Sequence, residues 1–494
     1  MHTRESQSDT VDLLVVGGGI NGAGIARDAA GRGLLVTLVE KDDLASATSS
    51  WSSKLIHGGL RYLEQYEFRL VAEALAEREV LLKVAAHLVW PARFIMPHVL
   101  ELRPRWMIRA GLFLYDHLSR RASLPGSHAV RLDAPPYNAG LNERLKHGFI
   151  YSDCRVDDAR LVVANALDAQ ARGARILTRV ECRSAVREGG LWRAKLSDGS
   201  SVSARAVVNA AGPWVKRVLN GSLGQPSEDK VRLVKGSHIM VPRLYEGKHA
   251  FILQNDDRRV VFMIPYGDLH TLVGTTDVPQ ENEDEKPLAS DEEVVYLCRA
   301  VNRYLKKPAR PEDVVWNYSG VRPLYDDGSE DPSAVTRDYT LRVDGGEHGV
   351  APVLSVFGGK ITTYRRLAEH ALEKLARYFP GLKPAWTSGQ PLLGSDFGGV
   401  SRMEARDAFF QTYPHIPEYI LRGIFRRHGA QSPAVVGDGD LGEEYGAGLT
   451  AREVRWLKDH EWARNAEDVL WRRTKAGLLM NETQRARVRV VMGD

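Results

Sequence analysis

The sequence predicts an α/β protein in which a dinucleotide-binding domain is interleaved with a β-rich domain and followed by a helical domain. A strand, a glycine turn, a helix and a second strand open the chain as VDLLVV, GGGINGAG, IARDAAGRG and LLVTLVE, which is a βαβ unit. Short β-rich runs such as HAFILQ and RVVFMIPYG occupy the middle of the chain. Helical, Arg-rich segments such as AREVRWLKDHEWARNAEDVLWRRT occupy its end.

The length predicts two or three domains, because domains average roughly 150 residues and the chain has 494. We expect residues 1–387 to combine a discontinuous nucleotide-binding domain with an interleaved β-rich domain. The first should comprise chiefly 11–100, 150–220 and 350–387, and the second chiefly 221–349. The Gly- and Ser-rich stretch 387–401 predicts a linker, and 388–494 a C-terminal helical cap.

Composition and charge exclude several classes of protein. With 43% hydrophobic and 26% charged residues, the chain is neither disordered nor fibrous. A net charge of +4 is too small to indicate a nucleic-acid partner. Cys154, Cys182 and Cys298 are odd in number and far apart, so we expect no disulfide framework, no metal site and a reducing compartment.

The N-terminal residues MHTRESQSDT are polar and lack the apolar core of a signal peptide. No segment supplies the roughly 18 apolar residues in a row that a spanning helix needs. We therefore expect a cytoplasmic protein, or one that is associated with the inner face of the cell membrane.

Gly17, Gly19 and Gly22 form a G-x-G-x-x-G turn directly after the first strand, and Glu40 ends the second strand. Gly17 permits the tight turn, Gly19 lets the backbone approach a pyrophosphate, and Gly22 lets the helix pack on the strand. The helix N-terminus offers amides to the anion, and a carboxylate at position 40 can accept hydrogen bonds from a ribose. This spacing predicts a dinucleotide without a 2′-phosphate, and by itself leaves FAD and NAD both open.

Motifs along almost the whole chain resemble one family. They include ATSSWSSKLIHGGLRYLE, YSDCRVDDARLV, VVNAAGPWV, KGSHIMVPR, GTTDV, YSGVRPL, TRDY, LSVFGGKITTYRRLAEHALEK and DHEWARNAEDVLWRRTK. Together with the glycine turn, they resemble the aerobic, FAD-dependent glycerol-3-phosphate dehydrogenases. The resemblance implies a Rossmann-like FAD-binding domain of the glycine oxidase and D-amino-acid oxidase type, and it favours FAD over NAD.

The resemblance also implies a cofactor site made of distant segments. Small residues from Asn209 to Gly212 close a strand, and Gly358 and Gly359 precede a helix expected from Ile361, whose amides would face the O2 edge of the flavin. The residues expected at FAD are Gly17, Gly19, Ile20, Asn21, Gly22, Glu40, Thr48, Ser49, Ser50, Ser53, Lys54, Leu55, His57, Gly58, Gly59, Ala211, Gly212, Trp214, Gly358, Gly359, Lys360, Ile361, Thr362 and Thr363.

The activity that the resemblance implies is oxidation of sn-glycerol 3-phosphate to dihydroxyacetone phosphate by hydride transfer from C2 to FAD. A phosphate dianion needs cationic contacts, for which arginine supplies a planar fork and lysine a compact charge. The residues that the resemblance places around the substrate are Arg61, Tyr62, Thr275, Arg322, Arg337 and Lys360.

The group that takes the hydroxyl proton has several candidates. His238, in KGSHI, has an ordinary pKa near 6.5 and could accept a proton at physiological pH, although a lone histidine is as often a structural residue. Arg322 or Lys360 could assist through a water, because clustered cations lower the pKa of the alcohol. His57 is a weaker candidate, since its turn could simply support the flavin.

In the resembled family, membrane quinone takes the electrons, which implies a surface that faces the membrane. The candidate is the segment 103–121, in which aromatic and aliphatic residues alternate with arginines, as in an interfacial helix over anionic lipid. The alternative is an amphipathic helix packed on the protein's own core. The residues are Trp106, Ile108, Leu112, Phe113 and Tyr115 among Arg103, Arg105, Arg109, Arg120 and Arg121. We also expect a homodimer, with the Arg-rich C-terminal helices as a solvated cap or a dimer surface.

Two other functions fit parts of the sequence. A different flavin enzyme of the same fold, such as an amine or amino-acid oxidase or a glycerol-3-phosphate oxidase that reduces oxygen, would share the cofactor site. A non-catalytic flavoprotein acting as a membrane-bound sensor would bind flavin that glycerol 3-phosphate does not bleach. The loop QENEDEKPLAS departs from the family pattern, and we expect no chemistry there.

Overall fold

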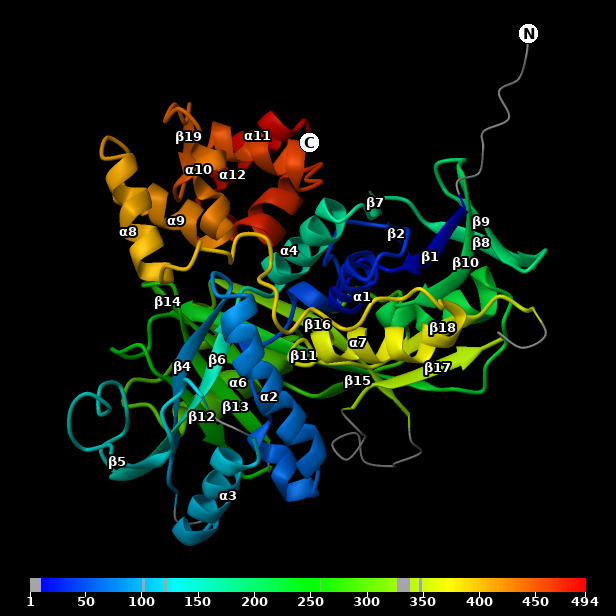
Figure 1. The fold of residues 1–494 in the computed structure, drawn as a ribbon. Helices are drawn as coiled ribbons and strands as arrows, with labels where there is room; N and C mark the ends of the chain where they lie inside the picture. Colours follow the sequence, from blue (N-terminus) through cyan, green and yellow to red (C-terminus); the bar gives the residue numbers. More distant parts are fainter. Residues whose placement is uncertain (1–9, 100–102, 120–121, 258, 327–337, 346–348) are drawn as a thin grey trace.

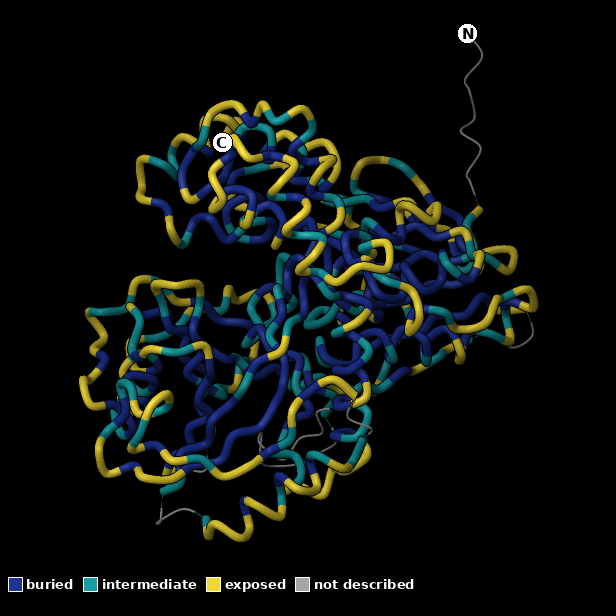
Figure 2. Tube along the Cα trace, turned by 60° about the vertical axis from the view of Figure 1, so that its left-hand side comes forward, coloured by how far each residue is buried: buried dark blue, intermediate teal, exposed yellow. Residues whose placement is uncertain are grey.

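Two β-sheets and a helical domain make up the part of the chain that the computed structural model describes, which is residues 10–99, 103–119, 122–257, 259–326, 338–345 and 349–494 (Figure 1). The buried residues follow the strands of both sheets and the inner side of the helical domain (Figure 2). Arg337, Arg120 and Arg121 lie outside the described residues.

The first sheet contains the predicted βαβ unit. In order across the sheet, its strands are β17 (Thr340–Asp344), β18 (Val353–Phe357), β10 (Ser201–Asn209), β1 (Thr10–Val16), β2 (Val36–Glu40) and β7 (Arg175–Thr178). Pairing is parallel from β18 to β7, and the antiparallel hairpin of β8 (Cys182–Glu188) and β9 (Leu191–Leu196) extends the sheet from β10. Strand β1 is fully buried from Leu13 to Val16, as is typical of a central parallel strand.

Three helices cover one face of this sheet and share its apolar core: α1 (Ile20–Gly31), α4 (Asp158–Ala171) and α7 (Tyr364–Leu375) (Figure 1). Gly24 lets α1 and α7 approach closely, because a Cβ at this position would lie 2.7 Å from the Tyr364 ring. Asp157 caps the N-terminus of α4 by accepting from the amide of Arg160. The predicted dinucleotide-binding architecture is therefore present.

The second sheet is mostly antiparallel. In order, its strands are β15 (Val278–Gln280), β11 (Val231–Pro242), β14 (His270–Gly274), β13 (Val260–Tyr266), β12 (Ala250–Gln254), β4 (Val89–Pro97), β6 (His147–Val156) and β3 (Leu55–Ile56), with β16 (Trp316–Tyr325) paired to β11 and β5 (His128–Arg131) to β6. Helix α6 (Asp291–Asn302) packs on one face, and α2 (Phe68–Val84) and α3 (Arg105–His117) pack on the other.

The sheets divide the chain differently from the expected ranges. Strands β4 and β6, expected in the nucleotide-binding domain, belong to the second sheet, whereas β17, expected in the β-rich domain, belongs to the first. Strand β4 reaches the second sheet by pairing with both β12 and β6. Alternating apolar residues predict a strand but carry little information about its partner, which explains the difference.

The C-terminal region folds as the expected helical domain. It consists of α8 (Arg402–Thr412), α9 (Glu418–His428), α10 (Ser432–Val436), α11 (Ala451–His460) and α12 (Glu482–Met492), with a small hairpin of β19 (Glu444–Gly446) and β20 (Leu449–Thr450). The expectation that its arginines form only a solvated surface is wrong for Arg472 and Arg473. Both are buried and pair with Asp43 of the first domain, because a buried carboxylate needs cationic partners.

Helix α3 combines the two arrangements considered for segment 103–121. Ile108, Leu112 and Tyr115 are buried in the core beneath the helix, so this side packs on the protein itself. The outer side exposes apolar residues, namely Trp106, Met107, Phe113 and Leu114. Within the described ranges, none of the helices combines the length and apolar character that crossing a bilayer requires.

Candidate cofactor and substrate site

The glycine turn lies between the end of β1 and the start of α1. A Cβ at Gly17, where φ is +112°, would lie 2.5 Å from the Ala210 carbonyl oxygen, and one at Gly22 would lie 1.9 Å from the Gly17 carbonyl oxygen. Only glycine fits at these two positions, so the turn lies directly against the end of β10. Helix α1 begins at Ile20, whose amide donates to Ser49 Oγ at 3.0 Å. Ser49 therefore lies at this helix N-terminus, the position at which a pyrophosphate would bind.

Glu40 ends β2 beside this turn. Its carboxylate accepts hydrogen bonds from the amides of Gly18, at 2.6 Å, and Asp42, at 2.8 Å. Burial raises its pKa above the ordinary 4.5, and the two amides act in the opposite direction. A carboxylate offers about four lone-pair sites, so these two bonds leave acceptors for ribose hydroxyls. The residues present therefore fit the adenosine half of FAD.

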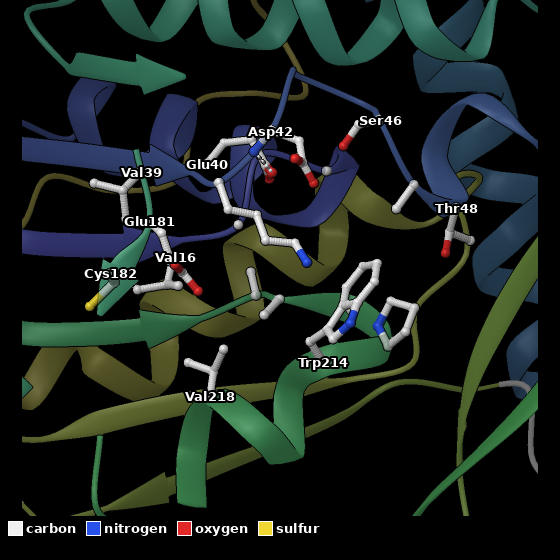
Figure 3. Close-up of a pocket in the computed structure, with 18 of the residues that line it drawn as sticks. Val16, Val39, Glu40, Asp42, Ser46, Thr48, Glu181, Cys182, Trp214 and Val218 are labelled. Atoms are coloured by element: carbon white, nitrogen blue, oxygen red, sulfur yellow. Dashed lines mark hydrogen bonds between the residues drawn. The ribbon is translucent and has the colours of Figure 1, made fainter. Parts of the chain in front are cut away.

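A pocket opens beside Glu40 (Figure 3). The ends of β1 and β2 line it together with residues 45–49, 180–182 and 210–214, the last of which follow β10. Lys41 Nζ lies 4.0 Å from the centroid of the Trp214 ring at its mouth. Trp214 Nε1 donates to Asp284 at 3.1 Å, and Asp284 also pairs with Arg217, which lines the pocket. Asp284 belongs to the loop QENEDEKPLAS, so this loop supports the side of the pocket that Trp214 and Arg217 form. Its departure from the family pattern did not indicate this role.

Asn21 connects the glycine turn to the second predicted cofactor segment. Its Nδ2 donates to the Gly358 carbonyl oxygen at 3.1 Å, across 337 residues of sequence. Gly358 and Gly359 have φ of +74° and +101°, and a Cβ at Gly359 would lie 2.8 Å from Asn21 Nδ2. Residues 17–22 and 358–359, both expected at FAD, therefore meet in space.

The helix that follows these glycines begins later than expected. Helix α7 starts at Tyr364, whereas residues 361–363 form a turn that is not helical. Three β-branched residues in a row, Ile361, Thr362 and Thr363, disfavour a helix start. Thr362 Oγ1 instead accepts a hydrogen bond from the His57 amide at 3.3 Å, which ties this turn to the HGG motif.

Residues 48–59 contain the 3₁₀ helix η1 (Thr48–Ser50) and strand β3 of the second sheet, and several of their side chains are buried. Lys54 is buried and binds Asp158 at 2.9 Å, and Leu55 belongs to the apolar core. The Gly58 amide donates to Tyr115 Oη at 2.8 Å. Lys54 and Leu55 were expected to bind the cofactor; their side chains are buried, so that expectation now concerns their backbone groups. Thr48 hydroxyl donates to the Val321 carbonyl oxygen at 2.6 Å and so joins this segment to β16.

Glycines in β11 and β14 make room for predicted site residues on the second sheet. A Cβ at Gly236 would lie 2.1 Å from Arg322 Nη2 and 2.6 Å from Thr275 Oγ1. A Cβ at Gly274 would lie 2.1 Å from the His238 ring. Because these glycines lack side chains, the Arg322 side chain can lie over β11 and the His238 ring can lie over β14.

Arg322 is the best-defined cation of the site. Its Nη2 donates to Thr275 Oγ1 and to the Thr276 carbonyl oxygen, each at 3.1 Å, and its Nη1 pairs with Asp277. The side chain keeps 27% of its surface exposed, so a ligand can still reach it. The sequence predicted Arg322 and Thr275 but missed Asp277, which stands in the same GTTDV motif.

Lys360 and Tyr62, both expected around the substrate, form a second cationic group. Lys360 Nζ lies 3.9 Å from the centroid of the Tyr62 ring. Burial, and after it the nearby Lys360, lower the pKa of His57 to about 4. The His57 ring lies 6.3 Å from Phe262, which pairs with Gly274 under His238. Phe262 therefore lies between His57 and the end of β14, the strand that Thr275 follows.

The two remaining substrate candidates are less defined. Arg61 is half-buried in the 3₁₀ helix η2 (Leu60–Gln65), next to Tyr62. Arg337 falls in the part of the chain that the structure does not describe.

His238 is almost completely buried between the sheets. Its ring stacks on Tyr318 at 4.8 Å, and Nε2 shares a 2.9 Å hydrogen bond with Ser53 Oγ. Burial lowers its pKa well below the ordinary 6.5, and Arg322 and Lys54 lower it further. The imidazole should therefore stay neutral even as pH falls to 6.5, where a histidine of ordinary pKa is half protonated.

Comparison with known proteins identifies the family. The sequence profile of the FAD dependent oxidoreductase family (DAO) matches residues 12–365. The chain belongs to this family. The match covers both sheets and all segments of the site, which agrees with the FAD-binding fold and with FAD as the cofactor.

Individual relatives of this oxidoreductase have related names. "Aerobic glycerol-3-phosphate dehydrogenase" of Escherichia coli (strain K12) is 52% identical over 489 residues, which are 97% of each chain. "D-erythritol 1-phosphate dehydrogenase" of Brucella abortus (strain 2308) is 49% identical over 490 residues, again 97% of each chain. The crystal structure of the glycerol-3-phosphate dehydrogenase from Bacillus halodurans complexed with FAD has a TM-score of 0.75 at 25% identity, covering 99% of this chain and 95% of that one.

Proposed function

We propose that this protein oxidises sn-glycerol 3-phosphate to dihydroxyacetone phosphate and passes the electrons to membrane quinone. The observation that carries the proposal is the pair of cationic groups, Arg322 with Thr275 and Lys360 with Tyr62, that lie beside the residues expected at FAD. The name of the relative from Escherichia coli supports the same substrate. Bound FAD would accept the hydride from C2 of the substrate.

Each cation has a separate task in this proposal. Arg322 can donate to phosphate oxygens, because Thr275 and Asp277 fix its guanidinium in one orientation. Lys360 offers a compact charge that stabilises the alkoxide character of the hydroxyl as its proton leaves. Arg61 and Arg337 complete the proposed phosphate site.

His238 is our proposed acceptor for the hydroxyl proton. Its lowered pKa keeps it neutral, so that a ring nitrogen is available as an acceptor. No described group hydrogen-bonds to its buried Nδ1, and Nε2 contacts Ser53. Water-assisted transfer near Arg322 or Lys360 is the alternative, and His57, with a pKa of about 4, is a weaker base.

Helix α3 supports the membrane part of the proposal. Its outer side exposes Trp106, Met107, Phe113 and Leu114, together with Arg105 and Arg109. It contacts η2, the segment that carries Arg61 and Tyr62. A quinone dissolved in the bilayer would therefore meet the protein near the proposed site. We place the protein at the inner face of the cell membrane, as a homodimer.

Anaerobic addition of glycerol 3-phosphate to the purified yellow protein tests the proposal. The absorbance of oxidised flavin should disappear within the mixing time of a stopped-flow instrument, and a quinone analogue should restore it. Persistence of the oxidised bands at saturating substrate would contradict glycerol 3-phosphate as the substrate and would fit a non-catalytic flavoprotein or a flavin enzyme with a different substrate. Fast recovery with oxygen and slow recovery with quinone would instead identify an oxidase.

A second substrate has a specific observation in its favour, since a relative of almost equal identity is named D-erythritol 1-phosphate dehydrogenase. Both compounds are polyol phosphates and need the same cations. The same anaerobic assay with D-erythritol 1-phosphate compares the two by the rate constant of flavin reduction divided by the dissociation constant of the substrate. A higher value for the erythritol compound would replace glycerol 3-phosphate in the proposal and leave the reaction type unchanged.

A further inference from the structure

The C-terminal domain contacts the first domain at Asp43, which follows Glu40 by three residues. Arg473 binds both carboxylate oxygens of Asp43, at 2.7 and 2.8 Å, and Arg472 Nε donates to it at 2.5 Å. Both arginines lie at the end of the π-helical turn η8 (Asp468–Arg473). Arg473 is held in turn by the Glu461 carbonyl oxygen, at 2.7 and 3.0 Å.

The same turn holds the loop after β2 from a second direction. Asp468 of η8 binds Arg179 at 2.7 Å, and the Arg179 amide donates to the Asp42 carbonyl oxygen at 2.8 Å. The Asp42 amide donates to Glu40, the residue expected to hold the ribose. The contacts therefore form a continuous chain from the C-terminal domain to Glu40.

These contacts are desolvated, so their geometry is strongly constrained. Asp43 and Arg473 have 1% and 0% of their side chains exposed. Although burial alone raises the pKa of Asp43, Arg473 and Arg472 lower it below its ordinary value, so it stays ionised. Removing one partner of a buried ion pair strands the other charge, which is far costlier than losing a surface contact. Movement of the Lys41–Asp43 loop would therefore break several buried bonds at once.

We propose that Asp43, Arg472 and Arg473 are positioning residues for the cofactor, through which docking of the C-terminal domain sets the affinity for FAD. They do not touch the substrate. They fix the loop that follows Glu40, the residue expected to bind the adenosine ribose. The helical domain thereby holds the nucleotide end of the site in one conformation. Affinity for the adenosine half of FAD is then the property that these residues control.

Asp43→Asn in the full-length protein tests this proposal, and Glu453→Gln is the matched control. Glu453 is an equally buried carboxylate that binds Arg427 at 2.6 Å and His428 at 2.9 Å within the C-terminal domain. The dissociation constants of FAD and of ADP are measured by titrating the apoprotein, and the melting temperature is recorded alongside.

We expect Asp43→Asn to weaken the binding of both FAD and ADP at least tenfold, which corresponds to about 1.4 kcal/mol. Glu453→Gln should change neither affinity more than twofold, while it lowers the melting temperature by a similar amount. Equal weakening in both variants, or none in Asp43→Asn, overturns the proposal. If Asp43→Asn does not fold, Arg473→Lys, which keeps the charge but loses the two-pronged contact, is judged by the same criteria.

Discussion

Arg322 and Thr275 meet in a 3.1 Å hydrogen bond above a glycine, Gly236, whose missing side chain leaves the space that both groups occupy. Arg322 lies in β16 and Thr275 directly follows β14, and the pairing of β11 with both strands brings the two residues together. Arg322 is also paired with Asp277, so the orientation of its guanidinium is fixed before an anion binds. Pre-organisation of this kind reduces the entropy lost when an anion binds.

Arg322→Lys should therefore lower kcat/KM for glycerol 3-phosphate by about 10- to 100-fold, mainly through KM, and Arg322→Ala by about a further tenfold. Lysine keeps the charge but cannot bind Thr275, Asp277 and a phosphate in parallel. Arg342→Lys is the control, because Arg342 pairs with Asp229 at an exposed position of β17. Steady-state kinetics with unchanged flavin content is the measurement. Unaltered KM in Arg322→Ala would show that the phosphate binds elsewhere.

Gly22→Ala should abolish FAD binding. The added Cβ would lie 1.9 Å from the Gly17 carbonyl oxygen, which is backbone and cannot move without opening the turn. Gly111→Ala is the control, since nothing lies within 4 Å of a Cβ there. The ratio of flavin absorbance to protein absorbance after purification measures the effect. A yellow Gly22→Ala protein of normal flavin content would mean that the turn does not carry the cofactor.

The sequence predicted those parts of the site that depend on local chemistry. The strand, turn and helix around Gly17 and Gly22 follow from periodicity and glycine spacing, and the structure contains them where expected. The start of α7 was misplaced because Gly358 and Gly359 signalled a helix, while the β-branched residues that delay it have a weaker effect.

Contacts between distant segments could not be predicted from one sequence. The pairing of Asp43 with Arg472 and Arg473 spans about the length of the chain, and no periodicity links such residues. The strand that pairs with β4 and the pKa of His238 could not be predicted from the sequence for the same reason. Both depend on what packs against a residue, and only tertiary burial moves the pKa of His238 away from the ordinary value of histidine.

The neutral state of His238 predicts the pH dependence of turnover. A base is active while unprotonated, and burial lowers the pKa of His238 well below 6.5, so its activity should persist as pH falls through 6.5. The rate of flavin reduction at saturating substrate, which removes the effect of substrate ionisation on binding, should therefore show no loss centred near pH 6.5. His238→Asn should lower this rate about 100-fold or more with little change in KM. A wild-type profile that falls with an apparent pKa near 6.5 would assign the proton to another group.

The exposed side of α3 predicts membrane binding. Trp106→Ser combined with Phe113→Ser should reduce sedimentation with anionic vesicles several-fold, because each replaces apolar surface that would enter the headgroup layer. Val490→Ser on α12 is the control, since Val490 is even more exposed, at 78%, but lies in the C-terminal domain. Flavin reduction by substrate should be unchanged in all variants. Equal sedimentation of the α3 variant and the wild type would move the membrane surface to another face.

Lys475→Met should stabilise the protein at neutral pH. The Lys475 ammonium is buried and has no hydrogen-bond partner among the described residues, and burial, followed by the nearby Lys54, lowers its pKa from 10.5 to about 8. The folded state therefore binds this proton less tightly than the unfolded state does. The resulting penalty is complete below pH 8, decreases as pH rises from 8 to 10.5, and vanishes above that.

The difference between these two pKa values corresponds to about 3 kcal/mol, which is the upper limit of the gain in unfolding free energy for Lys475→Met at pH 7. The gain should shrink as pH rises from 8 to 10.5, because the wild type then loses its penalty. Urea unfolding of both proteins at pH 7 and pH 10 measures it, and Lys383→Met, at an exposed position, controls for the loss of a surface charge. A gain that is equal at both pH values would mean that packing of the methionine, rather than removal of a buried charge, stabilises the variant.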